Sequence, residues 1–365
     1  MHMHRITGIV VSLFVFASLC VAQEAKVPSN IAVGINHRTP DNMLYSNANI
    51  GFFANVDTLR GAQLALFTGV VRNEMRGVNI GVLSAVSHGR AYGVQIAGFV
   101  NAGSGEMRGV QMASVANVAH SFNGVQIGGL TNACTSPMRG MQIAGITNIA
   151  MGVKRGWQMA AVANVCSSYM RGLQTALHNY ADTLNGSQIG VLNVCISHPR
   201  GVQIGVINYS RDTIAHKIGL VNVNPLTRID MMVYGGSSTK FNVAARFRNR
   251  STYSMIGFGT HYMGLDEKFS GALFYRIGQY FMLTPRLSVS GDVGYYHVET
   301  FEEHKAGKPS RLYSLQARVN IDYRIGKTLG AFVSGGYGDT RYYHHARKYR
   351  DRAIIEAGLT LRYHR

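Results

Sequence analysis

The sequence predicts an all-β protein in two parts. An N-terminal β-solenoid of about twelve coils, each of 14–16 residues, precedes an eight-stranded antiparallel transmembrane β-barrel. Two patterns predict this architecture: a glutamine-centred motif that recurs at a short period, and alternating segments rich in Tyr and Phe that follow it. A fixed short period is typical of repeat proteins, whose units stack because no unit buries its apolar side alone.

Residues 1–22 are predicted to be a secretory signal peptide. Arg5 precedes an apolar run from Ile9 to Val21, and Ala22 closes a run of residues that suits signal cleavage. The run is too short for a membrane-spanning helix, and no other segment has eighteen consecutive apolar residues. The chain is therefore predicted to be exported, with residues 23–46 forming a lead-in to the repeats.

The repeat domain is predicted at 47–225, where copies read GVQIAGFVNAGSGEMR and GMQIAGITNIAMGVKR. We interpret each copy as one coil, with two short strands, a corner at small residues such as Ala97-Gly98, and a polar loop. Stacked coils would place the repeat glutamines above one another at the ~4.8 Å strand spacing, as in the amide ladders of stacked parallel strands. The predicted structural ladder comprises Gln95, Gln111, Gln126, Gln142, Gln158, Gln174, Gln188 and Gln203.

Three cysteines, Cys134, Cys166 and Cys195, occupy the same position of the repeat as small residues in other copies. They fall in alternate coils, about 10 Å apart, which is too far for a disulfide. The pattern predicts buried apolar side chains and no metal site.

The barrel is predicted at 226–365. This stretch holds 22 Phe, Tyr and Trp residues, against eight in residues 61–225. The strands are expected at 229–237, 241–248, 253–263, 270–282, 287–299, 312–325, 329–337 and 353–363. Turns after the second, fourth and sixth strands are short, which is typical of periplasmic turns in bacterial outer-membrane barrels. A soluble eight-stranded barrel is the alternative.

The Gly-Val-Gln-Ile-Gly/Ala motif with its following Asn resembles the surface-repeat family of outer-membrane proteins found in Bacteroidetes and spirochaetes. The resemblance covers residues 47–224 and implies β structure and a place in the cell envelope. It implies no catalytic residues. The C-terminal part resembles small outer-membrane barrels, although the chain ends on His364-Arg365, whereas such barrels often end on an aromatic residue.

The predicted export makes nucleic acid a poor partner, and the net charge of +18 fits better with anionic lipid headgroups, lipopolysaccharide or acidic glycans. An arginine precedes the repeat glycine in most coils, and stacking would align these arginines along one edge. Guanidinium groups suit phosphate and carboxylate geometry. The candidate anion-binding residues are Arg76, Arg108, Arg139, Arg155, Arg171 and Arg200.

A polar cluster is expected at the outer end of the fifth barrel strand, formed by His297, Glu299, Glu302, Glu303 and His304. Such residues hold metals or act in acid–base catalysis, but a solvated loop is the simpler interpretation. In the repeats, the acids Glu74, Glu106, Asp182 and Asp212 are scattered, whereas sugar-cleaving sites need paired carboxylates.

The sequence therefore predicts a non-enzymatic outer-membrane protein, without a cofactor, metal or catalytic residue. Its repeats are expected to present a surface to another envelope protein, a glycan or a lipid. The alternatives are an enzyme that modifies lipid headgroups at the barrel rim, and a surface adhesin. The loop lengths favour the periplasm as the location of the repeats over the cell exterior.

Overall fold

A computed structural model describes residues 36–38, 44–197, 200–211, 216–262, 269–301, 311–343 and 348–363. Within these ranges the chain forms strands and contains no helix, so none is present that could cross a membrane. Two compact units are present, Met1–Ile204 and Gly205–Arg365. The predicted signal peptide lies outside the described residues, and the domain limits predicted from the sequence stay predictions.

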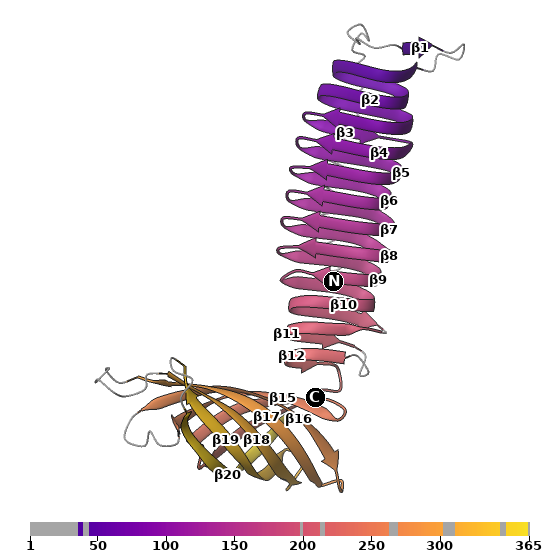
Figure 1. Ribbon diagram of the computed structural model, residues 1–365. Coiled ribbons are helices and arrows are strands. Elements are labelled where there is room, and N and C mark those ends of the chain that lie inside the picture. Colours follow the sequence, from indigo (N-terminus) through magenta and orange to yellow (C-terminus); the bar gives the residue numbers. More distant parts are fainter. Residues whose placement is uncertain are drawn as a thin grey trace. The chain divides into compact units, whose positions relative to one another are not determined.

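The repeats form one parallel sheet that winds into stacked coils (Figure 1), and its longest strand, β2, runs through more than two coils. Its strands are β1 (Asn36–Arg38), β2 (Leu44–Gly81), β3 (Ser84–Ser87), β4 (Arg90–Ala97), β5 (Val100–Ala113), β6 (Ala116–Gly128), β7 (Thr131–Ala144), β8 (Thr147–Ala160), β9 (Ala163–Thr175), β10 (His178–Ser197), β11 (Val202–Ser210) and β12 (His216–Val223). β1 pairs antiparallel with the start of β2. The predicted solenoid is confirmed.

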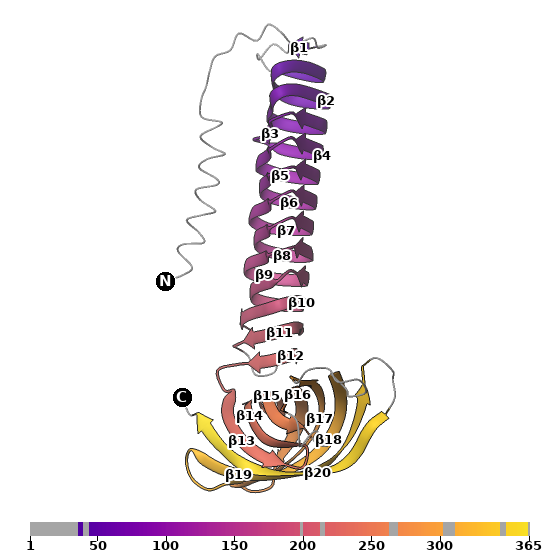
Figure 2. The ribbon, with the colours of Figure 1, turned by 90° about the vertical axis from the view of Figure 1, so that its left-hand side faces the viewer.

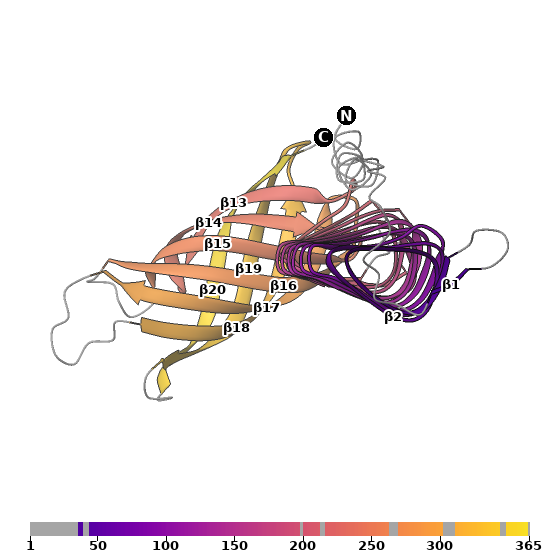
Figure 3. The same cartoon turned by 90° about the horizontal axis from the view of Figure 1, so that it is seen from above.

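Successive coils stack in register, so equivalent residues lie above one another. Gln111 pairs with Gln95 and with Gln126, and Asn117 with Asn101 and Asn132. Seen along the stack, the coils overlie one another (Figure 3). Each coil has a Gln face, such as residues 109–113, and an Asn face, such as residues 116–119, joined at a corner.

The polar tails of the copies were predicted to be loops, and this is wrong. β5 runs from Val100 to Ala113 through its tail without a break. In stacked coils the neighbouring coil offers backbone partners at every position, so the tail is hydrogen-bonded as well. Differences in copy length appear as register shifts within the tails, for example between Gly103 and Glu106.

A column of glycines starts the Gln face of each coil. Gly109 has φ of 137°, a conformation that side chains rarely adopt, and a Cβ atom there would lie 1.9 Å from the carbonyl oxygen of Gly93 in the preceding coil. The backbone therefore turns and approaches its neighbour at a point that only glycine permits. This explains why Gly precedes the Gln motif in copy after copy.

The apolar core of the solenoid is narrow and consists of two stacked columns. One column holds large side chains, including Met75, Met107, Phe122, Met138 and Met170. The other column holds small ones, including Ala119, Cys134, Ala150, Cys166 and Ala181. The prediction that the cysteines occupy a tight interior column is confirmed.

The second unit contains a closed eight-stranded antiparallel barrel (Figure 2). Its strands are β13 (Arg228–Gly236), β14 (Thr239–Arg248), β15 (Thr252–Tyr262), β16 (Ser270–Met282), β17 (Leu287–Thr300), β18 (Arg311–Arg324), β19 (Leu329–Tyr342) and β20 (Lys348–Tyr363). β20 pairs with β13 and closes the ring. All eight predicted strands are present, but β19 and β20 extend about five residues further than predicted, because their ladder continues to the Arg341–Lys348 pair.

The connections of the barrel differ between its two ends. Short turns at residues 249–251, 283–286 and 325–328 lie at the end where β13 begins and β20 finishes. The opposite end carries the connections at 237–238, 263–269, 301–310 and 343–347, of which the last three are the long ones. The chain therefore enters the barrel, at the start of β13, and leaves it, at the end of β20, on the short-turn side.

Candidate functional site

The predicted glutamine ladder lies in the interior of the solenoid. From Gln95 to Gln203 each side chain is fully buried, and from Gln111 onward each Nε2 donates to the Oε1 of the glutamine in the preceding coil at 2.8 Å. A buried amide costs free energy unless it is hydrogen-bonded. The ladder meets this need because every coil supplies the acceptor for the next one. These residues therefore have a structural position and do not face a ligand.

An asparagine ladder runs beside it at the corner of the coils. Asn101 donates from Nδ2 to Oδ1 of Asn117 at 2.8 Å, and the chain of such bonds continues through Asn132 and Asn148 to Asn193. The same Nδ2 of Asn101 also donates to the Met112 carbonyl at 2.7 Å, on the Gln face of the following coil. Each asparagine thus ties the Asn face of its own coil to the Gln face of the next one.

Burial makes the three interior thiols poor nucleophiles. Cys134, Cys166 and Cys195 are buried and form no disulfide. Burial raises the pKa of the Cys134 and Cys166 thiols to about 11, although backbone hydrogen bonds oppose the shift. At neutral pH both side chains are therefore thiols, and the thiolate is the reactive species.

We expect Cys134, Cys166 and Cys195 to resist iodoacetamide at pH 8 in the folded protein and to react once urea unfolds it. Mass spectrometry of alkylated peptides measures this directly. Rapid labelling of Cys134 without urea would show that the column opens in the native state.

The candidate arginines form an exposed row along the edge of the Gln face. Arg139 and Arg155 are cross-strand neighbours, and Tyr92 stands in the row between Arg76 and Arg108. The guanidinium carbons of Arg76 and Arg108 lie 5.9 and 5.8 Å from the centre of the Tyr92 ring. Tyr92 thus separates two like charges and binds both through cation–π contacts.

Acids neutralise only part of this row. Glu74 pairs with Arg76, and Glu106 with Arg108, both at 2.9 Å. The hydrogen bond to Glu106 raises the pKa of Arg108. Within the described residues Arg139 and Arg155 have no ion-pair partner, and no acidic side chain follows until Asp182. The middle of the row is therefore a run of unneutralised positive charge.

Next to the arginine row lies a feature that the sequence analysis missed: the outer side of the Gln face is apolar. Because each glutamine points inward, the residues directly before and after it point outward, as Val110 and Met112 do around Gln111. A third apolar column stands at the corner. We call these three columns the apolar face. Its most exposed members include Phe67, Leu83, Phe99, Met112, Leu130, Ile146, Trp157, Met159, Val162 and Leu177.

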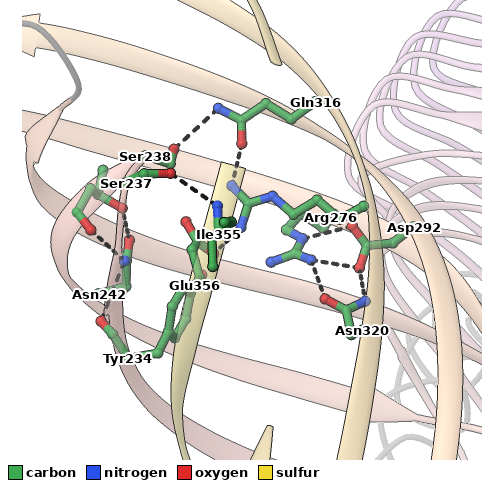
Figure 4. A network of polar contacts seen from close by, with 12 residues as sticks. Tyr234, Ser237, Ser238, Asn242, Arg276, Asp292, Gln316, Asn320, Ile355 and Glu356 are labelled. Atoms are coloured by element: carbon green, nitrogen blue, oxygen red, sulfur yellow. Dashed lines mark hydrogen bonds and ion pairs between the residues drawn. The ribbon is translucent and has the colours of Figure 1, made fainter. Parts of the chain in front are cut away.

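A network of charged and polar side chains lies in the interior of the barrel (Figure 4), together with a buried cluster that includes Phe274, Tyr296 and Phe332. Arg276 donates to both carboxylate oxygens of Asp292, at 2.8 and 2.6 Å, and to Oδ1 of Asn320 at 3.0 Å. Arg318 pairs with Glu356 in the same interior. Near the short turns, Arg246 bridges Asp230 and Asp322, at 3.0 and 2.7 Å. All these side chains are buried.

The outer surface of the barrel, in contrast to the charged network inside, is apolar, because apolar side chains face outward from every strand. Examples are Val233, Leu273, Val319 and Ile355. Aromatic residues gather at both ends of this apolar belt. Phe241, Phe269, Phe301, Tyr313 and Tyr343 lie towards the long loops, and Phe281, Tyr323 and Tyr363 towards the short turns. An apolar belt between two aromatic girdles around a polar interior is the pattern of transmembrane barrels.

This unit is a transmembrane β-barrel.

Known proteins give no closer identification. No family model matches the chain, and no curated protein matches it. Several solved barrels match about two fifths of it. A de novo designed transmembrane β-barrel is 13% identical, with 39% of this chain and 98% of that chain covered and a TM-score of 0.25. Neisserial surface protein A is 9% identical, with 38% and 96% covered and a TM-score of 0.27. The Yersinia pestis outer membrane protein Ail is 10% identical, with 38% and 98% covered and a TM-score of 0.26.

The candidate cluster at the barrel rim is only partly described. Glu302, Glu303 and His304 lie outside the described residues. His297 and Glu299 alternate with the inward-facing Tyr296 and Val298, so they point away from the barrel interior. His297 bonds the Tyr343 hydroxyl through Nδ1 at 2.9 Å, and Glu299 pairs with Arg311 at 3.1 Å. In the described part of the chain, no three His, Cys, Asp or Glu side chains are placed to hold a metal ion.

Proposed function

We propose that this protein is an outer-membrane structural and interaction protein that binds an anionic envelope component along the arginine row. The observation that carries the proposal is the row itself: arginines recur in most coils on one exposed edge, and Arg139 and Arg155 have no carboxylate beside them in the described structure. Two unit charges ~4–5 Å apart repel by about 1 kcal/mol in water and by more near a protein surface. A bound polyanion relieves that repulsion at several coils together.

The chemistry of the row favours phosphate or carboxylate groups as ligands. The planar guanidinium group binds both in a bidentate manner, and rows of such groups suit a ligand with repeated charges. Lipopolysaccharide phosphates and acidic glycans have this character and occur in the bacterial envelope. We therefore propose one of these as the partner, with lipid headgroups around the barrel as its second contact.

Replacing Arg139, Arg155 and Arg171 by glutamine tests the proposal. Since exposed charge pairs contribute about 0.2–1 kcal/mol each, the triple variant should bind lipopolysaccharide roughly 3- to 100-fold more weakly at low salt. The readout is the dissociation constant of the full chain in lipid vesicles, measured at two salt concentrations.

The matched control replaces Arg250, Arg286 and Lys327, in the short barrel turns, by glutamine. This variant loses the same net charge and should keep its affinity. Equal weakening by both triple variants would assign the binding to overall charge and remove the special role of the arginine row.

We further propose that the repeats lie in the periplasm. The support is the position of β13 and β20, which carry the chain into and out of the barrel on its short-turn side. Short turns are periplasmic in bacterial outer-membrane barrels. An epitope tag at Gly103-Ser104 should therefore be hidden from antibody on intact cells, while a tag at 305–308 should be reached. Accessibility of both tags would favour a surface adhesin instead.

A further inference from the structure

The apolar face is too extensive for a surface that only meets water. Between Gln63 and Gln203 none of its three columns contains a charged side chain. Phe99 is 56% exposed, Trp157 51% and Leu177 56%. Nine coil steps at ~4.8 Å by five residues at ~3.3 Å give an area of about 700 Å². The largest apolar patch of a typical monomer is about 300–600 Å², and one side of a standard protein–protein interface is about 800 Å².

We propose that the apolar face binds the apolar face of a second copy of this chain. Two faces of the same solenoid share one coil spacing, so side chains that interdigitate at one coil can interdigitate at all of them. A partner with a different spacing would fit over only a few coils. Sheets that pack in this way lie ~10 Å apart, with their inner side chains forming a common core.

The arginine row decides how the two copies are oriented. The row lies along one edge of the apolar face, and the apolar corner column lies along the other. If the coils of the two copies run in opposite directions, facing sheets bring arginine row against arginine row, which repels. If they run in the same direction, each arginine row lies beside the partner's apolar corner column. The structure therefore favours a parallel dimer whose twofold axis follows the stack, with both arginine rows at accessible edges.

Trp157 is expected to contribute most to this interface. It is the single tryptophan of the chain and stands in the column directly before the glutamines, with Met141 and Leu173 as its neighbours in the column. Tryptophans in the middle of an interface, surrounded by apolar side chains that exclude water, contribute most to affinity. Replacing Trp157 by alanine should weaken the dimer by roughly 30-fold or more.

Cysteine cross-linking in native membranes tests both the contact and its direction. Leu64→Cys and Ile204→Cys place single thiols in the same column, about 43 Å apart along the stack. Cys134, Cys166 and Cys195 are buried and do not compete. A parallel dimer brings each new cysteine close to its own copy, so each variant alone should form a disulfide-linked dimer on mild oxidation. His120→Cys, exposed on the Asn face, is the control and should stay monomeric.

Each other outcome overturns part or all of the proposal. If Leu64→Cys links only to Ile204→Cys in cells that express both, the copies are antiparallel and the charge argument fails. If both cysteines react with a soluble maleimide but form no dimer, the apolar face does not bind a second copy. Links to a different protein would make that protein the occupant.

Trp157 provides a second readout that does not depend on cysteine. In lipid vesicles, raising the number of copies per vesicle should move the Trp157 emission to shorter wavelength, because dimerisation removes water from the indole. An emission that is already shifted at one copy per vesicle would indicate lipid on the apolar face and would contradict the dimer. The arginine row stays exposed in this dimer. The result of the dimer experiments therefore does not decide the anion-binding proposal, which the triple arginine variant tests separately.

Discussion

Replacing Gln142 by leucine should lower the stability of the coils around it by about 2–6 kcal/mol. Gln142 donates to Gln126 and accepts from Gln158, so the leucine leaves one buried acceptor and one buried donor without a partner. Each unsatisfied buried group costs about 1–3 kcal/mol. Hydrogen exchange of the backbone amides in residues 126–158 measures the loss, because stability in a repeat protein is set by each coil and its nearest neighbours.

Met141→Leu is the matched control for this prediction. Met141 points outward beside Gln142 and is not part of the ladder, so its replacement should change stability by no more than about 0.5 kcal/mol. If Gln142→Leu leaves amide protection unchanged, then water or a side-chain rearrangement satisfies the broken ladder, and the ladder is not a main source of stability.

Replacing Arg276 by methionine should destabilise the barrel by about 3–5 kcal/mol. The change removes the partner of Asp292 and leaves a carboxylate buried among polar groups that were arranged around an ion pair. The measurement is urea unfolding of the protein in lipid vesicles, followed by the shift in gel mobility that separates folded from unfolded barrels.

A double variant separates the ion pair from simple packing. Arg276→Met with Asp292→Leu removes both charges and should recover most of the lost stability, since replacing both members of a buried pair by apolar residues is often neutral. Arg286→Met, in an exposed turn, makes the same substitution without loss. Equal destabilisation by the single and double variants would show that the shape of Arg276, and not its charge, holds the barrel interior.

The repeat period and the aromatic strands made the architecture predictable from the sequence. The period sets the coil, and the alternation of residues such as those of β17 sets the barrel. The tails were not predictable as strands, because their side chains follow no simple alternation and their pairing comes from the adjacent coil. The charge network of the barrel could not be predicted from the sequence either, because Arg246 and Asp322 are 76 positions apart and meet only once the sheet closes.

The apolar face could have been found in the sequence. If Gln95 points into the solenoid, then Val94 and Ile96 must point out, since side chains alternate along a strand. In the sequence, residues 94–96 resemble a short apolar run with one polar member, which hides this consequence. A surface strand usually has its apolar side chains inside and its polar ones outside, whereas this strand has the opposite arrangement. The arrangement can be recognised only after the glutamine has been assigned to the interior. The arginine row, in contrast, follows from spacing alone.

The two amide ladders are polarised in opposite senses. From Gln111 to Gln203 every glutamine donates towards the N-terminal end of the stack, whereas the asparagines from Asn101 onward donate towards its C-terminal end. The amide dipoles of the two rows therefore largely cancel within each coil. A stack built in this way accumulates no side-chain dipole as it lengthens, so a coil can be added or lost by duplication or deletion without an electrostatic penalty. The number of coils, and with it the length of the solenoid, is thus free to change.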